Sequence, residues 1–479
     1  MSDEKAAEKY RVRLPGDGSC GYNHAIQRPF AGENHMEEKR KTAGLDTERV
    51  IPTYFRLALP VVVGSIITII YNLADTFFIA RTNNALLVAG VSVCSPLFMI
   101  LMAFGNIFGQ GGSSLISRLL GKQATDDVGR VSAFCFYAAL AAGVVVGGGM
   151  FLFRDSLLVL LGASEEVLPY AREYGTVLML GGPLVVVNFI HMNLLRCEGM
   201  PGLSMAGTAV GAVVNIILDP LMIPSMGAAG AAAATVIGYA CSDLFLLAVV
   251  LRKSKVLTVR PDVRITGSQA RNIVAIGITA AITNLASSLC VMMINRQLLP
   301  FGDDKIAAMG IVLKISMIVN MIMVGFAFGG IPLFGFLIGS GQKEKLRQLL
   351  RFCLAFLCLL ALSVSTVVIL AAKPLVSLIT PDAELTGLAV PMLRWQVTGC
   401  VFGGIVMLLT CLFQASGKAL PAMILSLSRQ GVVFLVVLLL AVRIAGYSGI
   451  LVSQCAADLL SAALALALYA GTRKKRQPE

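Results

Sequence analysis

Four aspartates lie inside long apolar stretches of this sequence, at Asp75, Asp219, Asp243 and Asp458. An ionisable group within a membrane is costly, so such residues usually face a cavity or a charged partner. Arg81 and Ser225 mark the expected outer ends of the stretches that contain Asp75 and Asp219. Each aspartate lies six positions before its marker, so both lie at a similar depth, roughly 9 Å along a helix below the outer end. Asn215 is one helical turn from Asp219, on the same face. Two carboxylates and an amide that face one another could bind a cation or share a proton.

A purely structural role explains the same residues. Each aspartate could reach the outer surface or cap a neighbouring helix, and Asp219 precedes Pro220, where the chain can bend in any case. For Asp243 we expect a role in helix packing. Asp458 is the only acid in the apolar stretches of the second half, and Lys314 could pair with it. The apolar stretches of the first half thus contain three of the four aspartates, and those of the second half contain one. This difference indicates that cation chemistry belongs to the first half of the chain.

The elements that position these residues follow from the composition. Of the 479 residues, 57% are hydrophobic and 14% are charged, whereas a soluble protein is about a quarter charged. This excludes a soluble globular protein and indicates an all-α, polytopic membrane protein whose spans need about 20 apolar residues each. Charged and Gly/Pro clusters separate twelve predicted spans, near 52–80, 86–117, 131–153, 173–195, 203–224, 228–251, 272–299, 306–337, 352–372, 390–415, 419–442 and 449–470.

The positive charge orients these spans. The net charge is +12, from 39 Lys and Arg residues against 27 acids. With the N-terminus inside, the inner loops and C-terminal tail hold 19 of the 39 basic residues and the outer loops hold 7. Because cytoplasmic loops collect Lys and Arg, we expect a multi-pass protein of the cell membrane with both termini in the cytoplasm. The excess charge then gives no reason to expect a nucleic-acid partner.

An internal repeat divides the spans into two groups of six. Four glycines recur 220 positions later, so that Gly90, Gly105, Gly109 and Gly121 match Gly310, Gly325, Gly329 and Gly341. Six spans is an even number, so the second copy enters the membrane in the same orientation and the repeat is parallel. The predicted organisation is a polar tail at 1–51, an N-lobe at 52–251, a basic linker at 252–271, a C-lobe at 272–470 and a basic tail at 471–479.

Two six-helix lobes around a central cavity are typical of transporters and flippases. We expect the cavity to be lined by Asn72, Met292, Lys314, Met317 and Met321, because methionine surfaces suit ligands of varied shape. His191 is expected to be a hydrogen-bonded core residue. The sequence has no HExxH, GxSxG or Walker A motif, so we predict that the protein is not an enzyme.

Several motifs resemble those of the multidrug and toxic compound extrusion (MATE) family. The resemblance covers about residues 50 to 472. In the first two helices it rests on the helix 1 run from Leu59-Pro60 through Tyr71-Asn72-Leu73-Ala74-Asp75 to Ile79 and on the end of helix 2 at Ile116-Ser117-Arg118-Leu119-Leu120-Gly121. Further along the chain it rests on the helix 5 motif Asn215-Ile216-Ile217-Leu218-Asp219-Pro220 and the start of helix 6 at Gly227-Ala228-Ala229-Gly230-Ala231.

The resemblance implies an antiporter whose first lobe binds H⁺ or Na⁺. In the prokaryotic branch that the chain is most similar to, the cation-binding groups correspond to Asp75, Asn215 and Asp219, with a hydroxyl near Thr235. With Na⁺ as the ion, Asp75, Asn215 and Asp219 would be its ligands; no other cofactor is expected. Another branch uses acids in helices 7 and 10, where this sequence has none.

The predicted function is therefore secondary active efflux of organic compounds, cationic or amphipathic, by H⁺ or Na⁺ antiport through alternating access. The expected partners are small drug-like molecules and membrane lipids, and the expected state is a monomer. The alternative is a lipid-linked oligosaccharide flippase of related fold. Its cavity should be strongly cationic to hold pyrophosphate, and Lys314, Arg429 and Arg296 are the available basic residues.

Overall fold

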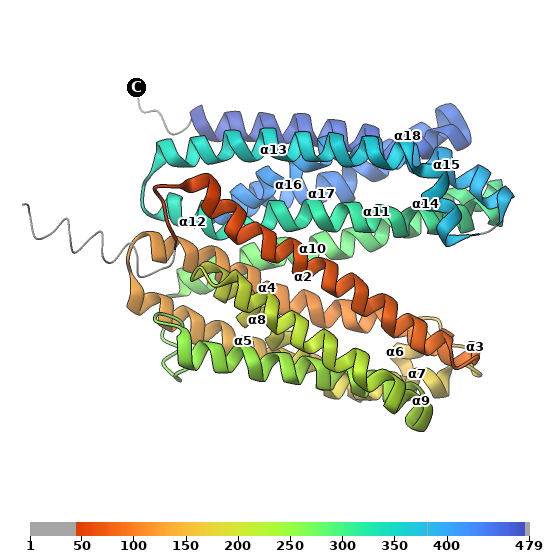
Figure 1. The fold of residues 1–479 in the computed structure, drawn as a ribbon, viewed down its shortest axis with the longest axis horizontal. Coiled ribbons are helices and arrows are strands. Elements are labelled where there is room, and N and C mark those ends of the chain that lie inside the picture. The colour runs from red at the N-terminus through yellow and green to blue at the C-terminus, as the bar shows by residue number, and fades with distance from the viewer. Residues whose placement is uncertain (1–44, 381, 475–479) are drawn as a thin grey trace, which may run out of the picture.

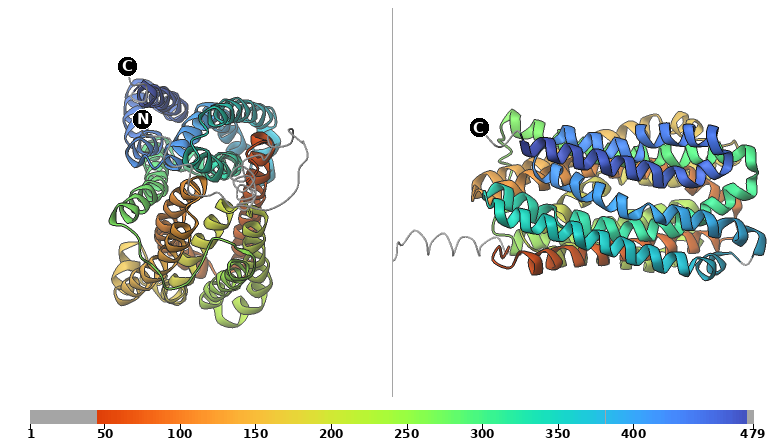
Figure 2. Two further views of the ribbon diagram at one scale, coloured as in Figure 1. Left: turned by 90° about the vertical axis from the view of Figure 1, so that its left-hand side faces the viewer. Right: turned by 90° about the horizontal axis from the view of Figure 1, so that it is seen from above.

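The computed structural model describes residues 45–380 and 382–474, and all regular elements in these ranges are helical. Helices form because lipid offers no partner for a backbone N–H or C=O group, so each must be bonded within its own segment. The helices run along one common direction and form two bundles, which we call the N-lobe (α2–α9) and the C-lobe (α10–α18) (Figures 1 and 2). Most of the predicted N-terminal tail lies outside the described residues, as does the end of the C-terminal tail.

The N-lobe contains eight helices. They are α2 (Val50–Ala80), α3 (Ala85–Val93), α4 (Ser95–Gly121), α5 (Thr125–Leu152), α6 (Arg154–Leu160), α7 (Leu168–Leu180), α8 (Gly182–Cys197) and α9 (Pro201–Lys253). The pair α7 and α8 is bent by 50° and forms one broken span.

The C-lobe follows the same plan. Its helices are α10 (Gly267–Leu298), the short 3₁₀ helix η1 (Leu299–Phe301), α11 (Asp303–Gly329), α12 (Ile331–Gly339), α13 (Lys343–Leu370), α14 (Ala372–Ile379), α15 (Ala383–Thr398), α16 (Cys400–Ala415), α17 (Ala419–Gln430) and α18 (Val432–Lys474). Here α15 and α16 form the bent pair, at 41°.

Two helical hairpins turn at glycines that occupy matching places in the two lobes. Gly227 interrupts α9 with φ 59° and ψ −131°, and Gly446 interrupts α18 with φ 56° and ψ −127°. Side-chain-bearing residues rarely adopt this conformation, so glycine is needed at both corners. Counting each bent pair as one span gives ten apolar spans within the part of the chain that the structure describes. Dividing α9 at Gly227 and the α17–α18 stretch at Gly446 makes them twelve.

The apolar surface agrees with a membrane setting. Large side chains such as Val145, Leu359 and Leu370 are more than 60% exposed on the outside of the bundles. Inside, an aromatic cluster joins the lobes, where Tyr54 on α2 donates a 2.9 Å hydrogen bond to the carbonyl of Phe326 on α11. Lipid would cover the exposed apolar side chains, and the aromatic cluster fixes how the two lobes meet.

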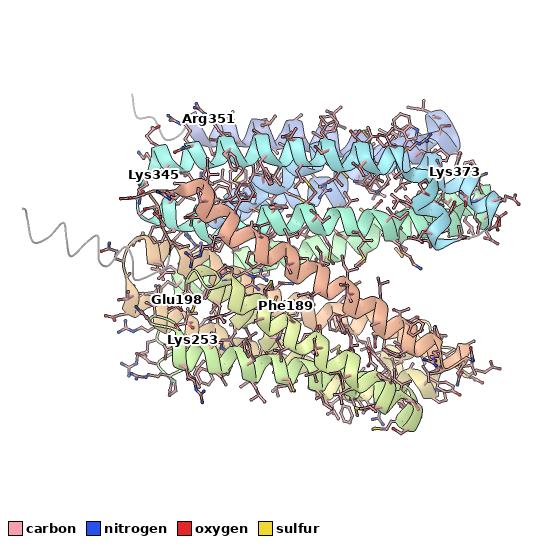
Figure 3. All side chains as sticks on the ribbon, in the orientation of Figure 1. Phe189, Glu198, Lys253, Lys345, Arg351 and Lys373 are labelled. Carbon is pink, nitrogen blue, oxygen red and sulfur yellow. The ribbon has the colours of Figure 1, made fainter. Side chains whose placement is uncertain are left out.

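The two ends of the bundle differ. Helix α2 begins and α18 ends at the same end, which also carries Lys253, Lys345 and Arg351 (Figures 1 and 3). We call it the basic end. Lys373 lies at the opposite, far end (Figure 3). Helices α2 and α11 contact one another near the basic end and diverge towards the far end (Figure 1).

Candidate functional site

A buried polar cluster in the N-lobe contains three of the predicted cation-site residues. The Asn215 Nδ2 group donates to Asp219 Oδ1 at 3.3 Å and to Thr235 Oγ1 at 3.4 Å. Asp219 is fully buried, and Asn215 and Thr235 are 2% and 4% exposed. The cluster therefore links a carboxylate, an amide and a hydroxyl out of contact with solvent.

The hairpin of α9 builds this cluster. Asn215 and Asp219 share a helix face because they are four residues apart, and the turn at Gly227 brings the second arm back alongside the first. The arms approach closely where Gly211 faces Gly238, since a Cβ atom at Gly238 would lie 2.8 Å from the Gly211 carbonyl oxygen. Thr235 is consequently within reach of Asn215, 20 positions away in the sequence.

Asp75 approaches the cluster from α2, which packs against α9. Its carboxyl group lies near enough to that of Asp219 for the two charges to interact. Three buried oxygens of this group have no hydrogen-bond donor among the described residues: Asp75 Oδ1, Asn215 Oδ1 and Asp219 Oδ2. Since buried polar atoms are normally paired, these oxygens suit a proton or a small cation.

The site does not resemble a transition-metal centre. Among the residues that the structure describes, no three His, Cys, Asp or Glu side chains are grouped to hold a metal ion. The cluster instead offers carboxylate, amide and hydroxyl oxygens, which hard cations prefer.

Tyrosines surround the aspartates, and the sequence reasoning missed them. Tyr71 and Tyr174 lie within electrostatic range of Asp75, and Tyr239 lies near Tyr71. Tyr71 is one helical turn before Asp75, so its spacing was an available signal. Tyr174 belongs to α7, so its position near Asp75 could be predicted only by knowing how the helices are arranged.

A second polar contact joins α8 to α9. Asn188 Nδ2 donates to Asp243 Oδ1 at 2.9 Å and to Ser242 Oγ at 2.8 Å. These bonds agree with the packing role expected for Asp243. His191, also on α8, is buried, but its ring nitrogens have no partner among the described residues; the ring packs 5.3 Å from Phe136. The expectation of a hydrogen-bonded histidine is therefore wrong.

Beside the cluster lies a cavity of about 440 Å³, here called the methionine cavity. Asn215 and Thr235 form part of its wall, and Asp219, which is hydrogen-bonded to Asn215, lies directly behind that wall. Its other lining residues include Tyr71, Asn72, Phe98, Met99, Met102, Phe189, Met192, Tyr239, Met317 and Met321. Cavities of this size and apolar character suit drug-sized ligands.

A second cavity, of about 400 Å³, lies towards the basic end between the lobes. Seven carboxamide side chains line this amide cavity: Asn106, Gln110, Asn193, Asn284, Asn320, Gln414 and Gln430. It adjoins the methionine cavity, because Met102, Phe189, Met192 and Met321 line both.

Three of the five predicted cavity residues line a cavity, and two do not. Asn72, Met317 and Met321 line the methionine cavity. Met292, which is 53% exposed, and Lys314 line neither of the two cavities. Both side chains lie on exposed parts of their helices, and the apolar sequence pattern alone does not distinguish a cavity from a lipid-facing surface.

Asp458 pairs with Arg429 rather than with Lys314. Arg429 Nε lies 3.0 Å from Asp458 Oδ1, and Gln454 donates to the same oxygen at 3.2 Å. The expected pairing with Lys314 is wrong because α17 packs against α18 and brings Arg429 to the acid, whereas Lys314 on α11 is exposed.

At the basic end the lobes are in close contact. Ser114 donates to the carbonyl of Gln414, and Arg118 donates to Asn272 Oδ1 at 2.5 Å. Gly111 on α4 lets the backbone at Ile273 of α10 approach so closely that a methyl group there would overlap the Ile273 carbonyl oxygen. The two lobes are therefore packed directly against each other at this end, through α4 and α10.

Comparison with known proteins places this geometry in a family. The MatE family model matches residues 60–221 and 276–440, about two thirds of the chain and parts of both lobes. Multidrug export protein MepA of Staphylococcus haemolyticus (strain JCSC1435) is 29% identical over 429 residues, covering 89% of this chain and 94% of that protein. MepA of Staphylococcus aureus (strain MRSA252) is 28% identical over 420 residues, covering 87% and 93%.

Solved structures share the fold. One described as MATE in the bent conformation has a TM-score of 0.84 at 24% identity and covers 91% of this chain and 97% of its own. An outward-facing multidrug resistance MATE family transporter gives 0.83 at 24% identity, covering 91% and 99%. These likenesses confirm the predicted fold of twelve spanning helices in two lobes, and the motif resemblance is confirmed by the family match: the chain belongs to the MatE family.

Proposed function

We propose that this protein is a secondary active multidrug efflux transporter that exports organic compounds, cationic or amphipathic, in exchange for H⁺ or Na⁺. The relatives of similar length are named as multidrug export proteins, and membership of this family supports a transporter rather than an enzyme. The observation that carries the proposal is the position of the Asn215–Asp219–Thr235 cluster: Asn215 and Thr235 form part of the wall of a drug-sized cavity, and Asp219 is hydrogen-bonded to Asn215 behind it.

The coupling step follows from the unpaired oxygens of this cluster. A cation that enters from the far end neutralises Asp75 and Asp219 and is held by Asn215 and Thr235. Neutralisation removes the repulsion between the carboxylates, so α2 and α9 can pack differently. Because Asn215 and Thr235 form the cavity wall, a change in their position alters the methionine cavity and releases its ligand.

Alternating access then requires that the two ends open in turn. We place the basic end in the cytoplasm, following the distribution of Lys and Arg, and the protein in the cell membrane. With the lobes in contact at Gly111 and Ile273, this arrangement corresponds to a state open to the outside. Residues 52–251 and 272–470 would move as two lobes joined by the linker at 252–271.

A flippase for lipid-linked oligosaccharides has less support. Of its candidate basic residues, Arg429 is neutralised by Asp458. Arg296 and Lys314 are exposed and line neither cavity. A pyrophosphate group would need several unpaired cations in one place.

Purified protein in proteoliposomes tests the proposal. Ethidium efflux should accelerate when an inward H⁺ or Na⁺ gradient is imposed and should stop when an ionophore dissipates it. Dye movement that is the same with and without either gradient would contradict antiport. Lipid translocation without any dye efflux would favour the flippase.

A further inference from the structure

The amide cavity has an unusual charge. Two arginines, Arg196 and Arg429, are among its lining residues, and none of its described lining residues is an acid. Arg429 is neutralised by Asp458 behind the wall. Arg196 forms no ion pair with any described residue, and its single hydrogen bond runs from Nε to Ser204 Oγ at 3.3 Å. Since arginine has five N–H donors, four remain available.

Three residues that line this cavity, Gln110, Gln414 and Ser426, each have a polar atom that is buried without a hydrogen-bond partner among the described residues. Gln414 Oε1 and Ser426 Oγ have no hydrogen-bond partner among the described residues, although these side chains are only 2% and 5% exposed. Gln110 Oε1 is also unpaired. Buried polar groups normally find partners, and seven carboxamide side chains line this cavity, so it suits a ligand that forms hydrogen bonds. The serine hydroxyl and the glutamine amides can donate to an anion as well as accept.

The two cavities can hold two parts of one molecule. Met192 lines both cavities, and Arg196 follows it by one turn on the same face of α8. An aromatic, positively charged part would fit the methionine cavity, where methionines and aromatic rings attract cationic rings. A carboxylate on the same molecule would then meet the Arg196 guanidinium, which binds such groups with two parallel hydrogen bonds.

We propose that Arg196 forms an anion subsite in the amide cavity, which binds the carboxylate of zwitterionic amphipathic substrates. The inference rests on the proposed efflux function and adds a substrate class to it. It assigns separate recognition groups to the two ends of the substrate: the methionine cavity takes the cationic ring system, and Arg196 takes the acid.

Two dyes that differ by one methyl ester test this directly. Rhodamine 110 carries a free carboxylate at neutral pH, and rhodamine 123 is its methyl ester. In proteoliposomes the wild-type protein should export both. Arg196→Gln should lower rhodamine 110 efflux at least about tenfold, the usual effect of losing a charged hydrogen bond, and leave rhodamine 123 efflux within about twofold. Arg196→Lys, which keeps the charge, should lose less.

The controls separate this role from a structural one. Arg130→Gln removes an exposed arginine that pairs with Asp127 and Asp262 outside both cavities, and should change neither dye. Fluorescence polarisation with purified Arg196→Gln protein should show unchanged rhodamine 123 binding, which reports folding, and weakened rhodamine 110 binding.

Equal loss of both dyes in Arg196→Gln, or no loss of rhodamine 110, would overturn the anion subsite. So would a wild-type protein that exports rhodamine 123 but not rhodamine 110, while the efflux function itself would stand. Export of neither dye would overturn both proposals.

Discussion

Asn215 and Asp219 are joined within one helical turn of α9, where the asparagine amide donates to the aspartate Oδ1 at 3.3 Å. The same amide donates to Thr235 on the returning arm of the hairpin. One side chain thus connects the buried acid to the wall of the methionine cavity. We regard this connection as the link between cation binding and the cavity.

Thr235→Val should weaken cation binding. Valine has the shape of threonine but no oxygen, so it removes a cation ligand and leaves Asn215 with one acceptor fewer. Losing one such bond costs about 1 kcal/mol, so about five times more cation should be needed for half-maximal efflux. Thr235→Ser keeps the hydroxyl and serves as the control; identical cation dependence for the valine and serine variants would exclude a role for the hydroxyl.

Gly111→Ala should impair the closure of the basic end. The added methyl group meets the Ile273 carbonyl, so it forces α4 and α10 apart in the state described here. We expect efflux to fall to about a tenth or less, which corresponds to a penalty of about 1.4 kcal/mol. Gly310→Ala is the matched control, since a Cβ atom there meets no neighbour within 4 Å. Full activity of Gly111→Ala would show that this contact does not limit the cycle.

Asp458→Ala should destabilise the C-lobe strongly. It leaves Arg429 charged and unpaired in a largely buried place, and breaking such a pair costs about 3–5 kcal/mol. Replacing both residues by apolar ones should recover much of the loss, because no buried charge then remains. Thermal unfolding in detergent measures these effects. Lys314→Ala should change stability by less than about 0.5 kcal/mol; a loss as large as that of Asp458→Ala would mean that Lys314 is also a partner.

Glu198 should make stability depend on pH. It lies at the end of α8, where its carboxylate accepts from Ser254 Oγ at 2.5 Å and from the Lys255 backbone at 2.7 Å. Burial raises its pKa above the ordinary value of 4.5, although these bonds act in the opposite direction. Ionisation is therefore less favourable in the folded protein than in the unfolded chain.

The contribution of Glu198 to stability is consequently full below pH 4.5 and declines as pH rises through the raised pKa. Glu198→Gln cannot ionise. As pH rises above about 4.5, the Tm of the wild type should fall relative to that of this variant. Parallel Tm curves over that range would show that burial of Glu198 has no such consequence.

Much of the architecture could be predicted from the sequence because lipid imposes simple rules. Apolar length identifies spans, and recurring glycines reveal the repeat. The structure adds a more exact sign of it: Gly227 and Gly446 have nearly the same backbone angles. In each lobe a second glycine, Gly230 or Gly449, packs against the carbonyl eight residues earlier.

The site could be predicted only in part. Asn215 and Asp219 share a face of one helix, so their contact follows from spacing. The partners of Asp458 depend on how α17 and α18 pack, and the separation of residues along the sequence does not predict that packing. Lys314 and Met292 show a similar limit, because a residue in an apolar helix can face lipid or a cavity without any change in the local pattern. The hydrogen-bonding surface around Arg196 and Gln414 combines α8 with α16 and is visible only in three dimensions.

The most direct test of cation exchange at the aspartate cluster is counter-movement of the ion itself. Proteoliposomes loaded with dye should take up H⁺ or ²²Na⁺ as the dye leaves, and Asp219→Asn and Asp75→Asn should abolish that uptake together with efflux. Asp155→Asn, at an exposed aspartate that pairs with Arg172, should retain both. Dye-coupled cation uptake that persists undiminished in both Asp75→Asn and Asp219→Asn would contradict the account.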